Sequence, residues 1–249
     1  MGRALADGLL SSGFAPAGIT VANPHTDKLS DLESKGITVT DDNSAAIVGA
    51  DAVVIAVKPW VLPEVAEQLR GHIDTDRQQV AVIVAGIPGD EIKAMFTHFG
   101  KVPALTLVMP NTAMSVGKSM TFVVSLQGDP ADIVGLFQPT GKVMLIEERL
   151  LPAATALASC GIAYALRYVR AAVEGGVELG FRAKDAQDIV AQTLEGASAI
   201  LNVPGAHAEA EIDKVTTPGG LTIRGLNAME DAGFTRAVIS GLRASVKKS

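Results

Sequence analysis

The chain has 249 residues with a formal net charge of −6 at pH 7, a hydrophobic fraction of 48 % and a charged fraction of 19 %. This composition excludes an intrinsically disordered chain, and an acidic sequence without blocks of Lys and Arg argues against nucleic-acid or membrane-surface partners. The single cysteine, Cys160, excludes a disulfide framework and fits a reducing compartment.

The first 148 residues alternate helical patterns with short apolar runs. Helices are expected over 3–12, 26–35, 43–49, 90–99 and 131–137, and strands over 19–22, 37–40, 52–57, 80–85, 104–109, 120–125 and 142–146. The runs at 52–57 and 80–85 are continuously apolar, as strands covered on both faces must be. This alternation predicts βαβ units in an α/β, doubly wound, Rossmann-type and mainly parallel sheet. Asn43 is expected to cap the third helix.

From residue 149 onward only helices are expected, over 151–179, 183–202, 218–231 and 235–246. The predicted domains are therefore 1–148, an NAD(P)-binding domain, and 149–249, an all-α domain. The stretch 150–166 is uncharged, but it is shorter than the roughly 20 apolar residues of a membrane span, so we interpret it as a buried helix. The first ten residues contain Arg3 and Asp7 and no apolar core of a signal peptide, so a soluble cytoplasmic protein is expected.

The chain opens directly as a helix. Gly2 followed by the helix 3–12 matches only the tail of the G-x-G-x-x-G dinucleotide fingerprint, which normally follows a strand. The first strand of the doubly wound order is therefore expected to be missing, either because Met1 is internal to a longer chain or because the sheet lacks it. In the second case the sequence predicts a gapped or rearranged sheet, weak NADPH binding and low activity.

Small residues or prolines follow the buried strands. They are Lys58-Pro59 after 52–57, Gly86 after 80–85 and Pro110-Asn111 after 104–109. Open parallel sheets bind ligands at the carboxyl ends of their strands, so a flat ligand could lie on this backbone. The alternative is that loops after buried strands use such residues in any case.

The end of the first predicted strand bears on cofactor choice. NAD-selective sites usually place Asp or Glu there to bind the ribose 2′-hydroxyl, whereas this chain has Asn23, with His25 and Lys28 nearby. A 2′-phosphate is therefore tolerated. The pattern favours NADP, with NAD as the alternative.

The helical half contains Val215-Thr216-Thr217-Pro218-Gly219-Gly220-Leu221-Thr222. With Thr217 as N-cap, two glycines would stand in the first helical turn at a cost of about 1 kcal/mol each relative to Ala. A structural helix start gains nothing from them, but bare amides at a helix N-terminus bind carboxylate or phosphate. Thr222 lies one turn further and could reach the same ligand. The alternative is an ordinary capped helix.

Other candidates are weaker. The four histidines share no ligand spacing, so no metal site is expected, and Cys160 is expected to pack in its helix. The acidic pairs Asp41-Asp42 and Glu147-Glu148 are interpreted as caps or solvated surface.

Several motifs, in order, resemble one family. The chain is similar to pyrroline-5-carboxylate reductases along essentially its whole length, through Ala56-Val57-Lys58-Pro59, Ala85-Gly86, Met109-Pro110-Asn111-Thr112, Gly175-Gly176-Val177, Leu179-Gly180, and Val215 to Thr222 continued to Glu230. The resemblance implies reduction of 1-pyrroline-5-carboxylate to L-proline, the last step of proline biosynthesis, by hydride transfer from NAD(P)H to a cyclic C=N bond. It also implies that the C-terminal helices form the interface of a homodimer or larger homo-oligomer.

The same resemblance implies roles for individual residues. Thr222 would be the catalytic residue, hydrogen-bonding the imine nitrogen, and Thr217, Gly219 and Gly220 would bind the substrate carboxylate. The cofactor would be lined by Gly2, Asn23, Asn43, Ala56, Val57, Lys58, Pro59, Ala85, Gly86, Met109, Pro110 and Asn111.

The chain departs from the family pattern where the long helix opens. It has Cys160 in place of a Ser and Ile162 in place of a Pro, in Ala158-Ser159-Cys160-Gly161-Ile162-Ala163-Tyr164. Two alternatives stay open. One, which these two residues raise, is a reductase of another imine, imino acid or 2-hydroxy acid. The other, which the incomplete dinucleotide fingerprint raises, is a non-catalytic dimeric homologue with an impaired cofactor site.

Overall fold

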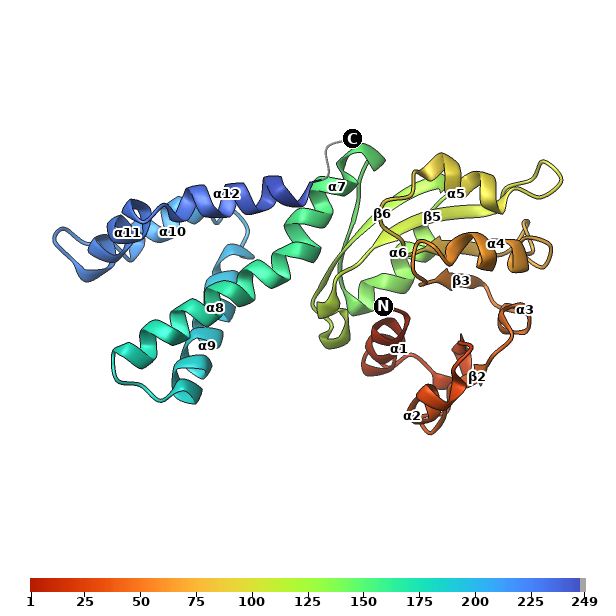
Figure 1. Cartoon of the computed structure of the whole chain (residues 1–249), viewed down its shortest axis with the longest axis horizontal. Coiled ribbons are helices and arrows are strands. Elements are labelled where there is room, and N and C mark those ends of the chain that lie inside the picture. The colour runs from red at the N-terminus through yellow and green to blue at the C-terminus, as the bar shows by residue number, and fades with distance from the viewer. Residues whose placement is uncertain (247–249) are drawn as a thin grey trace. The chain divides into compact units, whose positions relative to one another are not determined.

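The computed structural model describes residues 1–246, which divide into two compact units, Met1–Ser159 and a second that begins at Cys160. The first unit is built from short helices and strands in alternation (Figure 1). Its helices are α1 (Gly2–Ser11), α2 (Ser30–Glu33), α3 (Asn43–Ala46), α4 (Leu62–Arg70), α5 (Gly89–Phe96), α6 (Ala131–Phe137) and α7 (Leu151–Ala154). Its strands are β1 (Thr20–Ala22), β2 (Thr38–Thr40), β3 (Ala52–Ile55), β4 (Gln79–Val82), β5 (Ala104–Met109), β6 (Ser119–Gln127) and β7 (Gly141–Leu145).

The strands form two sheets rather than one. β1 pairs with β2 in parallel, and a second sheet has the order β3-β4-β5-β6-β7. Adjacent strands of this second sheet are parallel, except that β5 and β6 are antiparallel. The loop between Met109 and Ser119 is too short for the crossover that a parallel pair needs. In the part of the chain that the structure describes, β1 does not pair with β3. The gapped, mainly parallel sheet that the sequence predicts is therefore confirmed.

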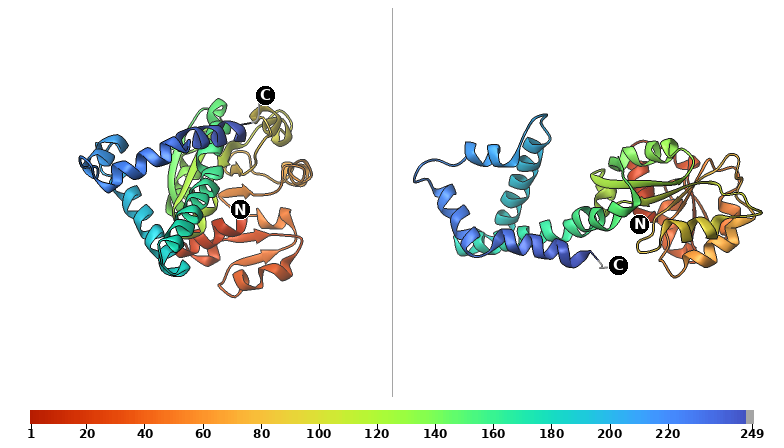
Figure 2. Two further views of the ribbon diagram at one scale, coloured as in Figure 1. Left: turned by 60° about the vertical axis from the view of Figure 1, so that its left-hand side comes forward. Right: turned by 90° about the horizontal axis from the view of Figure 1, so that it is seen from above.

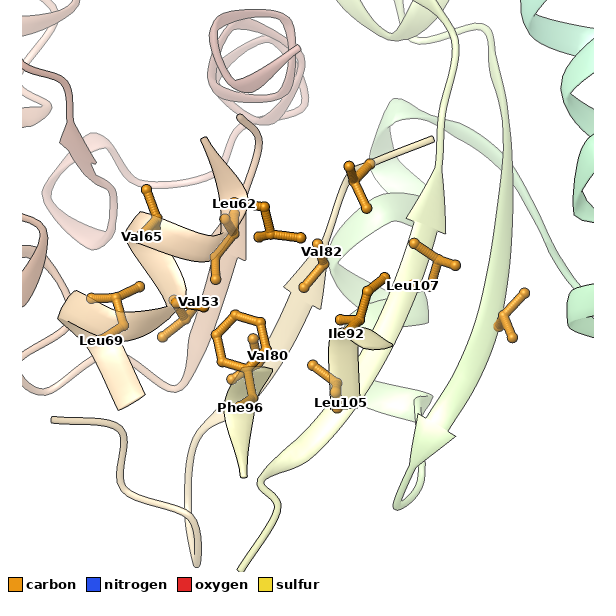
Figure 3. Close-up of a cluster of buried hydrophobic side chains, with 14 of the residues drawn as sticks. Val53, Leu62, Val65, Leu69, Val80, Val82, Ile92, Phe96, Leu105 and Leu107 are labelled. Carbon is orange, nitrogen blue, oxygen red and sulfur yellow. The ribbon is translucent and has the colours of Figure 1, made fainter. Parts of the chain in front are cut away.

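Helices cover both faces of the five-stranded sheet (Figure 2). On one face, α4 and α5 point apolar side chains at the strands. Figure 3 shows Leu62, Val65 and Leu69 of α4 and Ile92 and Phe96 of α5 against Val53, Val80, Val82, Leu105 and Leu107. Continuous apolar strands are buried in this way because helices lie on either side of them. Helix α4 is not among the helices expected from the sequence, although it lies where the alternation requires one.

Helix α1 joins the two sheets. Its Leu5 and Leu9 pack in the core cluster that covers the other face of the large sheet, whereas Ala6 packs with Leu29, Leu32 and Ile37 over the small sheet. One amphipathic helix thus spans both sheets where no strand pairing connects them.

The second unit is entirely helical. Its helices are α8 (Gly161–Glu178), α9 (Ala183–Leu201), α10 (Ala208–Lys214), α11 (Leu221–Asp231) and α12 (Phe234–Ser245). Helices α8 and α9 form an antiparallel hairpin (Figure 1), in which a Cβ atom added at Gly176 would lie 3.0 Å from the Cβ of Ala186. Gly180, with φ at +101°, ends the first of these helices as the sequence predicts.

The interpretation of 150–166 as a buried helix is wrong for this chain. Only its first turns are covered, whereas Leu157 is 63 % exposed and Leu166 is 61 % exposed. Among the described residues of the second unit, Ala186 alone is buried. The apolar side chains are present, but a single chain offers nothing to cover them.

One helical stretch among the described residues, Glu148–Glu178, is long and apolar enough to cross a membrane. Helices that pack against other protein segments can have the same length and composition, so this is weak evidence for a membrane span. The helix expected over 151–179 is, moreover, interrupted by a π-helical segment, Thr155–Cys160. Such segments are often found at functional sites.

Candidate active site

Three of the predicted cofactor turns meet at one edge of the large sheet. Strands β3, β4 and β5 are parallel neighbours, so the turns that follow them lie side by side at their carboxyl ends. This edge of an open α/β sheet is where ligands bind. Ala56 to Pro59, Ala85-Gly86 and Met109 to Asn111 are therefore brought together.

The turn after β3 lies next to the start of α1. The Val61 N–H donates to the Lys58 carbonyl at 2.9 Å, which places Pro59 and Trp60 at the centre of the turn with the Trp60 side chain exposed. A Cβ atom added at Gly2 would lie 3.5 Å from the Cβ of Ala56. The N-terminus of α1 has no side-chain cap and no acidic residue in its first turn. Its free amides can hold a phosphate.

The turn after β4 presents bare backbone. Gly86 has φ at +80°, where glycine is strongly favoured, and no atom lies within 4 Å of the position its Cβ would take. At the end of this turn, the Gly89 N–H at the start of α5 donates to Oε1 of Glu148 at 2.7 Å. A flat group could therefore lie against the Gly86 backbone.

The turn after β5 is fixed by Asn111, whose side chain is buried. Its Oδ1 accepts from the Ala113 N–H at 3.0 Å, and its Nδ2 donates to the Ala158 carbonyl at 3.3 Å. The hydroxyl of Ser159 donates to the Pro110 carbonyl at 3.3 Å. The Asn111 side chain therefore shapes the turn, and the turn itself is buried against the segment that holds Ala158 and Ser159.

Asn23 and Asn43 lie after the strands of the small sheet. The Oδ1 of Asn23 accepts from the His25 N–H at 2.9 Å in a local turn. The expectation that Asn43 caps α3 is wrong, because Asp42 is the N-cap and its Oδ1 accepts from Ser44 and Ala45. Asn43 occupies the first helical position instead and donates to Oε1 of Gln68 at 2.7 Å.

The predicted substrate residues gather at the start of α11, but not as a helical turn. Thr217 to Gly220 form a β-turn, closed by the Gly220 N–H donating to the Thr217 carbonyl at 2.9 Å. Pro218 at the second position and Gly219 with φ at +69° at the third are the residues that a type II turn requires. The expected helix start at Pro218, with Thr217 as N-cap, is therefore wrong; α11 begins at Leu221 with Gly220 as N-cap.

The turn gives the two glycines a structural reason that the sequence analysis did not find. A Cβ atom added at Gly220 would lie 2.5 Å from Oγ1 and 3.0 Å from the carbonyl oxygen of Thr217, so this position favours glycine. The turn still leaves the start of α11 without a side-chain cap. Thr222, the second residue of the helix, is exposed, and within residues 1–246 its hydroxyl makes no hydrogen bond. An anion and a hydrogen-bonding group could therefore both be bound here.

Sequence reasoning missed two contacts of the first-unit turns. Glu148, interpreted as a cap or solvated surface, caps a helix 59 residues earlier in the chain, and Ser159 was assigned no role. Neither contact has a local signature, because both join segments far apart in the sequence. No group of three or more His, Cys, Asp and Glu residues able to hold a metal occurs in the described part of the chain.

Comparisons with known proteins cover both units. Residues 148–249 match the family model "Pyrroline-5-carboxylate reductase dimerisation", and residues 1–86 match "NADP oxidoreductase coenzyme F420-dependent". The whole chain is 34 % identical to pyrroline-5-carboxylate reductase 2 of Dictyostelium discoideum, of which it covers 89 %. It is 35 % identical to pyrroline-5-carboxylate reductase 1 of the same organism, but spans only 47 % of that longer protein. A solved pyrroline-5-carboxylate reductase from Coxiella burnetii matches with a TM-score of 0.89 at 27 % identity, over 98 % of this chain and 92 % of that one.

Proposed function

The chain belongs to the pyrroline-5-carboxylate reductase family, and from this premise we propose that it reduces 1-pyrroline-5-carboxylate to L-proline with NADPH, the last step of proline biosynthesis. The observation that carries the proposal is the match to pyrroline-5-carboxylate reductase 2 of Dictyostelium discoideum, which runs over the whole of this chain and covers 89 % of that protein. The exposed helix start beside Thr222 suits a small substrate that carries both a carboxylate and a C=N bond.

The substrate site is assigned to Thr217, Gly219, Gly220 and Thr222. The uncapped amides at the start of α11 bind the carboxylate, where the positive end of the helix favours an anion. The Thr222 hydroxyl hydrogen-bonds the imine nitrogen and so fixes the orientation of the C=N bond. A protonated imine is already an activated electrophile, so placement supplies most of the catalysis and no strong general base is needed.

The cofactor site is assigned to the first unit. The free amides at Gly2 suit a pyrophosphate, and the backbone at Gly86 leaves room for a flat ring. When bound, NADPH supplies the hydride that the imine carbon receives. Asn23, in place of an acidic residue, favours NADPH over NADH.

The second unit is assigned to homodimerisation. Its helices expose large apolar side chains, including Leu166, Leu179 and Leu221, and it matches a dimerisation model. A second copy of the chain would cover these surfaces, in a homodimer or a larger homo-oligomer. A cytoplasmic location accords with the single cysteine and with the metabolic role proposed.

Thr222 provides the test of this function. We expect the purified chain to oxidise NADPH when 1-pyrroline-5-carboxylate is added, with proline formed in equal amount. Thr222→Ala should lower kcat/KM about 100-fold, because a group that orients the reacting nitrogen is lost, whereas Thr222→Ser should keep most of the activity. Normal turnover by Thr222→Ala would remove this hydroxyl from the mechanism.

Two alternatives have their own tests. Cys160 and Ile162, which depart from the family pattern, adjoin Ser159 and its contact to Pro110, so a panel of other cyclic imines and 2-hydroxy acids should be assayed beside pyrroline-5-carboxylate. A non-catalytic homologue would fail to bind NADPH. The only tryptophan of the chain, Trp60, lies in the turn after β3, so quenching of its fluorescence gives a direct titration.

A further inference from the structure

The segment 148–159, which we call the connecting segment, touches two of the three cofactor turns. At one end, Glu148 accepts the Gly89 N–H at 2.7 Å after the turn that follows β4. At the other, Ala158 and Ser159 hold the turn that follows β5, through Asn111 and Pro110, each at 3.3 Å. Between these ends, Leu151 and Ala154 are buried in the main core of the first unit. The segment is therefore anchored to the sheet whose turns it holds.

Of the three contacts that the connecting segment makes with these turns, the one from Glu148 involves a charged side chain. Helix α5 begins after Pro88, which offers no capping side chain, so its first amides need another partner. The Glu148 carboxylate supplies one and opposes the positive end of the helix, although Asp90 and Glu91 in the first turn are also acidic. Among the described residues, this is the only side-chain hydrogen bond to the turn 85–89.

The Glu148 carboxylate lies close to Gly89, in space that a side chain at position 89 would fill. A Cβ atom added at Gly89 would lie 2.6 Å from Oε2 of Glu148 and 2.5 Å from Cδ2 of Leu126. Glycine at this position thus lets the carboxylate reach the backbone. Both neighbours are ends of flexible side chains, so an added methyl group would displace Glu148 rather than unfold the helix.

We infer that Glu148 is a positioning residue for hydride transfer, which holds the Ala85–Gly86 backbone where the nicotinamide ring is expected to lie. The inference rests on the proposed function, because it assigns this turn to the cofactor. Most of the residues proposed to line the dinucleotide lie elsewhere, from Gly2 at the start of α1 to the turns after β3 and β5. Loss of Glu148 should therefore impair the chemical step more than cofactor affinity.

The variants are Glu148→Ala, Glu148→Gln and Gly89→Ala in the full chain, with Glu147→Ala as matched control, because Glu147 pairs with Arg149 on the surface. We expect Glu148→Ala to lower kcat about tenfold while the Kd of NADPH changes less than threefold. Glu148→Gln, which keeps an oxygen acceptor, should recover most of kcat, and Glu147→Ala should match the wild type. Gly89→Ala should resemble Glu148→Ala, and the double variant should be no worse than either.

A readout without substrate keeps this test separate from that of the proposed function. Amide hydrogen exchange of the cofactor-free chain should quicken over 86–92 in Glu148→Ala and not in Glu147→Ala. If the wild type does not reduce pyrroline-5-carboxylate, the proposed function fails, and this exchange still decides whether Glu148 orders the turn. Unchanged exchange overturns the inference. So does a lower Tm with unchanged kcat, which would make Glu148 a helix cap only.

Discussion

Asp7 on α1 is held between two cations that connect this helix to the region of α2. Its Oδ1 accepts from Nζ of Lys35 at 3.1 Å and its Oδ2 from Nε of Arg3 at 3.2 Å, while Arg3 also pairs with Asp31. Partial burial raises the pKa of Asp7, but hydrogen bonds from Lys35 and Arg3 outweigh it and hold that pKa below its ordinary value of 3.8. The small sheet is thus fastened to α1 by charge as well as by apolar packing.

The depressed pKa of Asp7 predicts the sign of a pH effect. A carboxyl whose folded pKa is lowered contributes stability that is present above its unfolded pKa and is lost as the pH falls through the folded pKa. Asp7→Asn should therefore lower the free energy of unfolding by about 0.5–1 kcal/mol at neutral pH, and this difference should shrink at acidic pH, as the pH falls through the lowered pKa of Asp7. Urea unfolding at neutral and at acidic pH measures it, with Asp27→Asn, an exposed carboxyl of the same region, as control. An equal loss at both pH values would contradict the ion-pair explanation.

The role of a residue could be predicted where its hydrogen-bonding partner is close in the sequence, and not where that partner lies far away. The pair Asp41-Asp42 is predicted to form a cap or solvated surface, and Asp42 is a cap. Thr217-Pro218 suits a helix start as well as a turn, so the sequence predicts a helix from Pro218, whereas the positive φ of Gly219 makes this segment a turn. The partner of Glu148 lies 59 residues away, beyond any local pattern.

At the scale of elements, α1 depends on a close approach at Gly8. A Cβ atom added there would lie 2.8 Å from the Met114 carbonyl oxygen and 3.1 Å from Cγ2 of Thr140. A backbone carbonyl cannot move as a side-chain end can, so α1 itself would have to shift. Because α1 packs over both sheets, this glycine fixes how the two sheets are joined.

Gly8→Ala and Gly135→Ala form a matched pair. Both glycines lie inside helices, α1 and α6, and alanine raises helix propensity by about 1 kcal/mol at each. At Gly135 no atom lies within 4 Å of the new Cβ, so the change should stabilise the chain by about 0.5–1 kcal/mol. At Gly8 overpacking should outweigh the gain and destabilise by about 1–2 kcal/mol. Urea denaturation measures both. Stabilisation by Gly8→Ala would show that α1 can move freely.

The elements that sequence could predict are those whose pattern is set by their own burial. The apolar runs that became β3, β4 and β5 are covered on both faces and carry continuous apolar residues for that reason. Helix α8 has an equally apolar sequence but is exposed in the single chain, as Leu166 and Tyr168 are. An apolar helix sequence predicts that the helix is covered, but it does not indicate whether the covering residues come from the same chain or from a second copy.

At the scale of the whole molecule, the first unit has two sheets with no strand pairing between them among the described residues, and the described part of the second unit buries almost no side chains. In the first unit, β1 and β3 are joined through α1 and not through strand pairing. The gap was predictable because the sequence begins its alternation with a helix, whereas the means of bridging it was not.

In the second unit, the described helices bury almost nothing, and their exposed apolar side chains need a partner. Leu166 lies on α8 with Val169 and Val173, beside α9, in a groove of about 460 Å³. We expect the wild type to sediment as a dimer or larger at micromolar concentration. Leu166→Glu should weaken self-association at least about tenfold, because a charge would be buried at the interface. Val48→Glu, the same kind of change at an exposed valine of the first unit, should leave it intact. A monomeric wild type, or equal behaviour of the two variants, would contradict assembly through α8.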